Sequence, residues 1–172
     1  MRLDADDFEL FGLPRRHALD LRALDERWKA LQAEVHPDRH ASGGAAAQRL
    51  AMQWSVRVNE AYRRLKDPVA RAAYLCALHG AAVDVHDNTA MPQDFLVQQM
   101  QWREALDDAQ ALRDIEALAD DVAAERRRRL AELAATLDER RDWAAAAQQV
   151  KALMFIERFA SQVESRLEAL GQ

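Results

Sequence analysis

Apolar side chains recur at spacings of three and four residues along almost the whole chain, which is the period of an amphipathic α-helix. The first long stripe of this kind comprises Leu21, Leu24, Trp28, Leu31 and Val35. Only five glycines and four prolines interrupt the 172 residues, and good helix formers such as Ala, Leu, Glu, Arg and Gln dominate the composition. The sequence therefore predicts an all-α fold.

A second long stripe, from Ala47 to Leu65, follows the first after a short polar stretch. Two amphipathic helices joined in this way predict an antiparallel hairpin, with Asp20 as the N-cap of its first helix. We expect the residues Ser42-Gly43-Gly44 between the two helices to form a flexible loop. Asp67-Pro68 predicts the end of the hairpin and the start of a third helix, from Val69 to His79, that ends at Gly80.

The periodicity is lost over residues 81–92 (AAVDVHDNTAMP), where Asp, Asn, Thr and Pro gather. Beyond them, apolar stripes predict helices from about Gln93 to Ala109, from Leu112 to Leu137 and from Trp143 to Leu170. Short connections between amphipathic helices are typical of a bundle. We therefore predict an N-terminal domain over residues 1–80, a linker over 81–92 and a three-helix bundle over 93–172.

Composition excludes several classes of protein. The net charge of −5 argues against broad nucleic-acid affinity, and the Arg126–Arg129 run circles its helix, which predicts a solvated surface. No apolar run approaches the ~20 residues of a membrane span, and the acidic start does not resemble a signal peptide. One cysteine, Cys76, permits no internal disulfide and is expected to be a small buried residue. We expect a cytoplasmic protein without a membrane partner.

The tripeptide His36-Pro37-Asp38 lies between the two long stripes. Proline fixes the backbone at this corner, Asp38 offers a charged hydrogen-bond acceptor, and His36 can donate or accept. One competing interpretation is that the corner only connects two helices. Another is a small metal-binding hydrolase that uses His36, Asp38 and His40, although a loop with no cysteine and no visible supporting residues gives that interpretation little weight.

Residues 4 to about 76 resemble the J domain, the module by which co-chaperones activate the ATPase of heat-shock chaperones. The resemblance depends on the tripeptide in its hairpin and on the closing residues Asn59 to Pro68, Arg71 and Tyr74. It implies that His36, Pro37 and Asp38 contact the ATPase partner. We expect Arg22 and Lys29, which are seven residues apart and share a helix face, to be steering charges. Val35 departs from the aromatic residue that the family often has there.

The remainder of the chain has neither the Gly/Phe-rich stretch nor the cysteine pairs of general protein-folding J proteins. Nearly the whole chain instead resembles the HscB family, the J-type co-chaperones of iron–sulfur cluster assembly, through Phe8 to Pro14, the loop from His36 to Gly43, Ala73 to Gly80 and the predicted bundle. The resemblance implies two partners, an HscA-type 70-kDa ATPase and an IscU-type scaffold. It implies no covalent chemistry and no cofactor. A J protein that delivers a different client remains the alternative.

The helix predicted from Phe95 to Ala109 offers a second group of apolar residues besides its core stripe. Phe95, Trp102 and Leu106 define the buried face, at ~100° per residue. Leu96, Val97 and Met100 fall outside it, and Phe155 lies off the stripe of the last helix. Apolar residues rimmed by acids are typical of a partner site, although they could also fill a groove between helices or pack on the J domain. The resemblance assigns scaffold binding to Leu96, Val97, Met100, Gln101, Glu104, Asp108 and Phe155.

Overall fold

The computed structural model describes residues 2–84, 86 and 91–171, and every regular element in this part of the chain is helical. This confirms the all-α prediction. The chain divides into two compact units, Met1–Leu75 and Cys76–Gln172. The domain limits proposed from the sequence stay a prediction, and residues 85 and 87–90 of the predicted linker lie outside the described residues.

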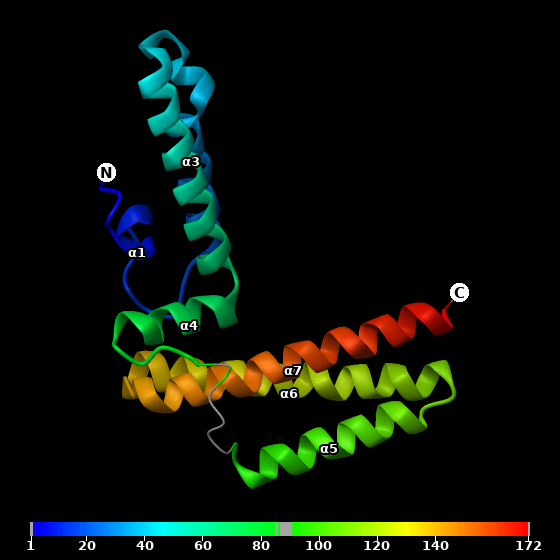
Figure 1. The fold of residues 1–172 in the computed structure, drawn as a ribbon. Helices are drawn as coiled ribbons and strands as arrows, with labels where there is room; N and C mark the ends of the chain where they lie inside the picture. The colour runs from blue at the N-terminus through cyan, green and yellow to red at the C-terminus, as the bar shows by residue number, and fades with distance from the viewer. Residues whose placement is uncertain (1, 85, 87–90, 172) are drawn as a thin grey trace. The chain divides into compact units, whose positions relative to one another are not determined.

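The N-terminal unit is built on an antiparallel hairpin of α2 (Leu21–Val35) and α3 (Gly44–Lys66), which lie side by side in Figure 1. A 3₁₀ helix, η1 (Pro37–Gly43), joins them, and α1 (Asp7–Phe11) packs on both. The interior of the hairpin is apolar, because Leu24, Val58 and Leu65 are completely buried. The apolar stripes read from the sequence are therefore the faces that α2 and α3 turn toward each other.

Side-chain caps set the helix boundaries of this unit. The Asp20 carboxylate accepts hydrogen bonds from the backbone N–H groups of Arg22 and Ala23, at 3.0 and 3.2 Å, which confirms its predicted role as the N-cap of α2. The Asp67 carboxylate accepts from the Val69 N–H at 2.9 Å, and α4 (Pro68–Leu78) begins there. These bonds satisfy N–H groups that have no partner within their own helix.

The buried carboxylate of Asp7 ties α1 to α3. It is completely buried and forms ion pairs with Arg57 Nη1 at 2.8 Å and Arg64 Nε at 2.6 Å. The Asp7 backbone N–H donates to the Tyr74 hydroxyl at 2.9 Å, and the Arg64 guanidinium lies over the Tyr74 ring. A buried charge is tolerated only when it is paired in this way, so the network fixes the position of the short helix α1.

The C-terminal unit contains α5 (Gln93–Asp108), α6 (Leu112–Ala135), a π-helical turn η2 (Thr136–Arg140) and α7 (Trp143–Leu170). Figure 1 shows α5, α6 and α7 running alongside one another. Their shared core includes Phe95, Trp102, Ile115, Ile156 and Phe159. The second helix of the bundle was predicted to reach Leu137, but α6 ends at Ala135. The next five residues form the wider π-helical turn η2, and Arg141, with φ of 52°, then reverses the chain.

We predict that Asp7→Asn lowers the free energy of unfolding by about 3 kcal/mol, because it leaves two guanidinium groups without their buried counter-charge. Urea denaturation followed by circular dichroism measures this. Asp4→Asn is the matched control, since the Arg2–Asp4 pair is exposed and its loss should cost less than about 0.5 kcal/mol. Equal stability of the Asp7 and Asp4 variants would contradict the conclusion that the buried Asp7 ion pairs hold α1 against α3.

Candidate functional site

The elbow, defined as His36, Pro37 and Asp38, begins where α2 ends at the buried residue Val35. His36 has extended-type backbone angles and Pro37 opens η1, so the helix cannot continue through them. The His36 Nδ1 atom accepts a hydrogen bond from the Asp38 backbone N–H at 3.2 Å. The side chains remain exposed, at 56% for His36 and 95% for Asp38. The neutral imidazole therefore carries its proton on Nε2, where it can donate to a partner.

The two residues after the elbow complete the end of α2. Arg39 Nη1 donates to the Ala33 carbonyl oxygen at 3.3 Å, and His40 Nε2 donates to the Glu34 carbonyl oxygen at 3.1 Å. These carbonyls belong to the last turn of α2 and have no helical partner. Arg39 and His40 therefore hold the elbow to the helix. The exposed Asp38 carboxylate lies 3.7 Å from His36 Nδ1.

The flexible loop predicted for Ser42-Gly43-Gly44 is wrong. The 3₁₀ helix extends to Gly43, and α3 starts at Gly44. Gly44 has φ of 85° and ψ near 180°, a conformation that only glycine adopts readily. The connection between the hairpin helices is therefore regular structure, with a single glycine that redirects the chain into α3.

The geometry gives the metal-binding alternative no support. His40 Nε2 is used by the Glu34 carbonyl and His36 Nδ1 by the Asp38 N–H, so the two imidazoles are oriented by different backbone groups. Within residues 2–84, 86 and 91–171, no three acidic, histidine or cysteine side chains gather closely enough to hold a metal ion.

A polar network across the hairpin holds α2 in place beneath the elbow. The Trp28 indole stacks on the Tyr62 ring with 4.6 Å between centroids, and its Nε1 donates to Asn59 at 3.0 Å. Asp25 accepts from the Tyr62 hydroxyl at 2.6 Å and from Lys66 at 2.9 Å. These bonds, led by that of Tyr62, lower the pKa of Asp25. The network is therefore present above the usual pKa range of an aspartate and weakens as pH falls through the lowered value.

Of the cations on α2, Arg22 and Lys29 are exposed, as the predicted steering role requires. Within the described part of the chain, no ion pair is formed by either side chain. Arg27, by contrast, donates to the Phe11 carbonyl at 2.7 Å and so fastens α2 to α1. The Asp25 carboxylate of α2 forms an ion pair with Lys66 of α3 at 2.9 Å. Arg22 and Lys29 are therefore exposed cations of α2, and their steering role stays a prediction.

The second candidate surface lies on α5 and α7, and we call its apolar part the docking patch: Leu96, Val97, Met100 and Phe155. Leu96 and Val97 are 45% exposed, Met100 is 72% exposed and Phe155 is 37% exposed. They consequently do not fill a groove between helices. The opposite side of α5 is buried: Phe95, Trp102 and Leu106 belong to the hydrophobic core of the bundle. Packing of α5 therefore does not depend on the residues of the patch. Phe95 touches Phe155, with 6.4 Å between ring centroids, and so connects the patch to the core.

A surface groove of about 680 Å³ runs along α5 beside the patch. Its lining contains four of the predicted residues and three that sequence analysis missed: Leu96, Met100, Glu104 and Asp108, with Gln99, Arg103 and Asp107. Val97, Gln101 and Phe155 lie outside the lining. The missed residues follow Leu96 and Met100 at helical spacing, which is the signal that could have identified them. Four of the seven lining residues are charged and two are apolar. Three of the charged residues are acids and one is the basic residue Arg103, so the groove carries net negative charge.

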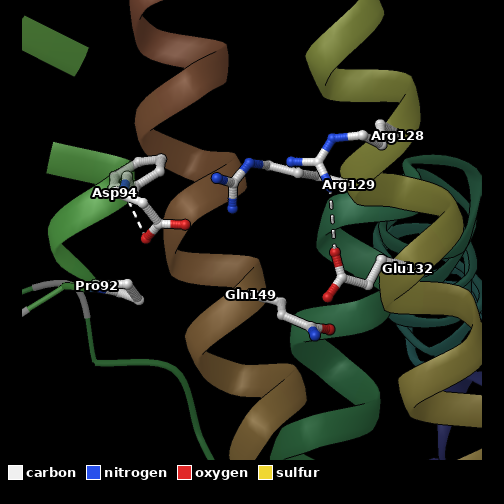
Figure 2. A pocket seen from close by; sticks show the side chains of 7 residues that line it. Pro92, Asp94, Arg128, Arg129, Glu132 and Gln149 are labelled. Atoms are coloured by element: carbon white, nitrogen blue, oxygen red, sulfur yellow. Dashed lines mark hydrogen bonds and ion pairs between the residues drawn. The ribbon is translucent and has the colours of Figure 1, made fainter. Parts of the chain in front are cut away.

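A separate, polar cavity of about 360 Å³ lies between the start of α5 and the helices α6 and α7. Figure 2 shows Asp94, Arg128, Arg129, Glu132 and Gln149 around it. Arg128 and Arg129 donate to Glu125, which is not part of the lining, and Glu132 lies 3.7 Å from Arg128. Because the carboxylates balance the guanidinium groups, the cavity has no excess positive charge and does not favour an anion.

The prediction that the Arg126–Arg129 run is simply a solvated surface is wrong for two of its members. The Arg129 guanidinium lies 4.9 Å from the centroid of the buried Phe95 ring, as a cation–π contact. Arg126 reaches across to α7 and donates to Glu157 at 2.9 Å. Both arginines therefore connect helices of the bundle, and neither contributes to a basic patch.

One family pattern matches the C-terminal unit, and individual relatives match nearly the whole chain. Residues 91–164 match the family pattern described as the HSCB C-terminal oligomerisation domain. The co-chaperone protein HscB homolog of Bordetella petrii is 50% identical over 92% of this chain and 94% of its own length. The homolog of Burkholderia multivorans is 49% identical over 95% of this chain and 94% of its own length.

Two solved structures share the fold. Chaperone HscB from Vibrio cholerae superposes with a TM-score of 0.83 at 35% identity, over 96% of this chain and 99% of that one. Human co-chaperone protein HscB superposes with a TM-score of 0.86 at 25% identity, over 98% of this chain and 83% of that one.

The exposed elbow on a helical hairpin, followed by a helical bundle, defines a J-domain co-chaperone. The chain belongs to the HscB family. Its relatives in Bordetella petrii and Burkholderia multivorans are named as co-chaperones.

Cys76 belongs to neither surface. It is buried, and desolvation raises the pKa of its thiol to about 11. We predict that Cys76 reacts very slowly with a thiol reagent at pH 8, because only ~0.1% of the thiol is ionised three units below this pKa. Reaction with Ellman's reagent, followed by absorbance with and without 8 M urea, checks this. Equal rates in native and unfolded protein would contradict the burial of the thiol.

Proposed function

We propose that this chain stimulates the ATPase of an HscA-type 70-kDa heat-shock chaperone and delivers an IscU-type iron–sulfur scaffold to it. The observation that supports this most directly is the presence of two exposed, chemically different surfaces on separate compact units. One is a charged elbow and the other is an apolar patch rimmed by acids. A protein with one such surface could bind a partner, whereas two allow it to bring partners together.

At the elbow, the Asp38 carboxylate accepts hydrogen bonds from an arginine of the ATPase, and His36 Nε2–H supplies a second, neutral bond. Arg22 and Lys29 attract an acidic face of the ATPase and raise the rate of encounter. The proline and the bonds of Arg39 and His40 hold the elbow before binding, so that little conformational entropy is lost when the ATPase binds.

At the bundle, Leu96, Met100 and Phe155 supply apolar area to the scaffold. Val97 adds to this apolar area, and Gln101 is a polar neighbour on the same helix. The acids Glu104 and Asp108 favour a partner with basic residues around an apolar centre. Holding both partners on one chain raises the concentration of the scaffold near the ATPase. No helix among the described residues is long and apolar enough to cross a membrane. We place this activity in the cytoplasm, with no cofactor.

Asp38→Ala should reduce the stimulated ATPase rate of the chaperone to near its basal value, because it removes the only strongly exposed charge of the elbow. A steady-state ATPase assay with chaperone, scaffold and this protein measures the effect. Asp121→Ala, which removes an exposed acid from α6, is the matched control and should stimulate normally. Retained stimulation by Asp38→Ala, or loss of its helical signal, would refute the proposed contact.

Met100→Ala and Phe155→Ala should each weaken scaffold binding about 5- to 30-fold, because each removes apolar area that a partner buries. Titration calorimetry with an IscU-type scaffold measures the affinity, and circular dichroism tests that the bundle stays folded. Leu112→Ala, an exposed leucine at the start of α6 outside the patch, is expected to bind as the native protein does. If all three variants bind equally, the scaffold docks elsewhere.

A further inference from the structure

Methionine sulfur is unevenly exposed along the chain. Among the described residues, Met100 is 72% exposed and Met52 is 57% exposed, whereas Met91 and Met154 are half-buried. Oxidation of a thioether requires an oxidant to reach the sulfur lone pair, so reactivity follows exposure. Met100 and Met52 are therefore the methionines that a dissolved oxidant reaches first.

The surroundings of these two methionines differ. Met100 lies in the docking patch and in the lining of the α5 groove, next to Leu96. Met52 lies on α3, in the other compact unit. The other apolar members of the patch, Leu96, Val97 and Phe155, are hydrocarbons that peroxide does not attack. The docking patch thus contains one oxidisable atom, and that atom is on its most exposed side chain.

We propose that Met100 is a redox modification site whose oxidation to the sulfoxide weakens docking of the client. This inference rests on the function proposed for the patch. The oxidant is a hydroperoxide, represented by hydrogen peroxide. The thioether sulfur attacks one peroxide oxygen, the O–O bond breaks, and the departing hydroxide takes the remaining proton to form water. Sulfur loses two electrons, which the peroxide gains, and Met100 becomes the sulfoxide.

The sulfoxide makes the most exposed side chain of the patch polar. Its oxygen is a strong hydrogen-bond acceptor, and burying an acceptor without a donor is unfavourable. The carboxylates of Glu104 and Asp107 in the same groove are acceptors too. The donors in its lining are the Gln99 amide and the guanidinium of Arg103, which lies over the Phe159 ring. An apolar partner surface that covers Met100 would bury the sulfoxide oxygen against hydrocarbon, which makes the free energy of binding less favourable. We therefore expect oxidation of Met100 to weaken binding about tenfold. Methionine sulfoxide reductases reverse the change, so the site can act as a switch.

The first measurement needs no partner. Native full-length protein is treated with hydrogen peroxide and sampled over time, and peptide mass spectrometry gives the oxidation rate of each methionine. Met100 and Met52 should oxidise several-fold faster than Met91 and Met154. Oxidation of Met100 at the rate of the half-buried methionines would overturn the proposal.

The second measurement is calorimetric titration of an IscU-type scaffold before and after peroxide treatment of this protein alone. Native protein and Met52→Leu should each lose about tenfold in affinity on oxidation and recover it after reductase treatment. Met100→Leu is compared with its own untreated form and should change less than about twofold. An equal loss in Met100→Leu, or no loss in native protein oxidised at Met100, overturns the proposal. Absence of binding by untreated native protein instead overturns the docking function itself, whatever the oxidation rates show.

Discussion

The packing of α2 against α3 is the constraint on which the elbow depends. Leu24, Val58, Ala61 and Leu65 are completely buried, so neither helix can slide without exposing apolar surface. With the two helices fixed side by side, the residues between them must reverse the chain within a few positions. Pro37 and the 3₁₀ helix η1 make this reversal. Because the two hairpin helices are fixed, the elbow between them is held in one exposed conformation.

Helical periodicity was enough to predict α2 to α7, and Asp, Pro and Gly residues marked several of their ends. Leucine and alanine stripes located α2 through α7 to within a few residues, and Asp20 caps α2 as expected. The 3₁₀ helix η1 and the roles of Arg39 and His40 were not predictable in this way. Their hydrogen-bond acceptors are backbone carbonyls of α2, and any residue type supplies a carbonyl. Sequence pattern therefore has no signal for such contacts until the path of the chain is known.

In the candidate client surface, too, some features were predictable from the sequence and others were not. The position of Met100 on the helical wheel correctly indicated exposure, because the buried face of α5 was already defined by Phe95 and Trp102. The polar residues Gln99, Arg103 and Asp107 of the groove were missed, since a polar residue on a surface helix is normally only solvated. Arg129 was misjudged for the opposite reason: its charge suggested solvent, yet its guanidinium packs on a core aromatic ring.

The near-complete exposure of the Asp38 side chain has a genetic consequence. Its carboxylate contributes little to the fold, so a chain that has lost it should accumulate to normal abundance instead of being cleared by proteases. Under the proposed function, such a chain would keep its client surface and continue to bind clients that it cannot deliver to the ATPase. Alleles altered at this position should therefore interfere with an intact copy in the same cell, whereas alleles that unfold the hairpin should be recessive.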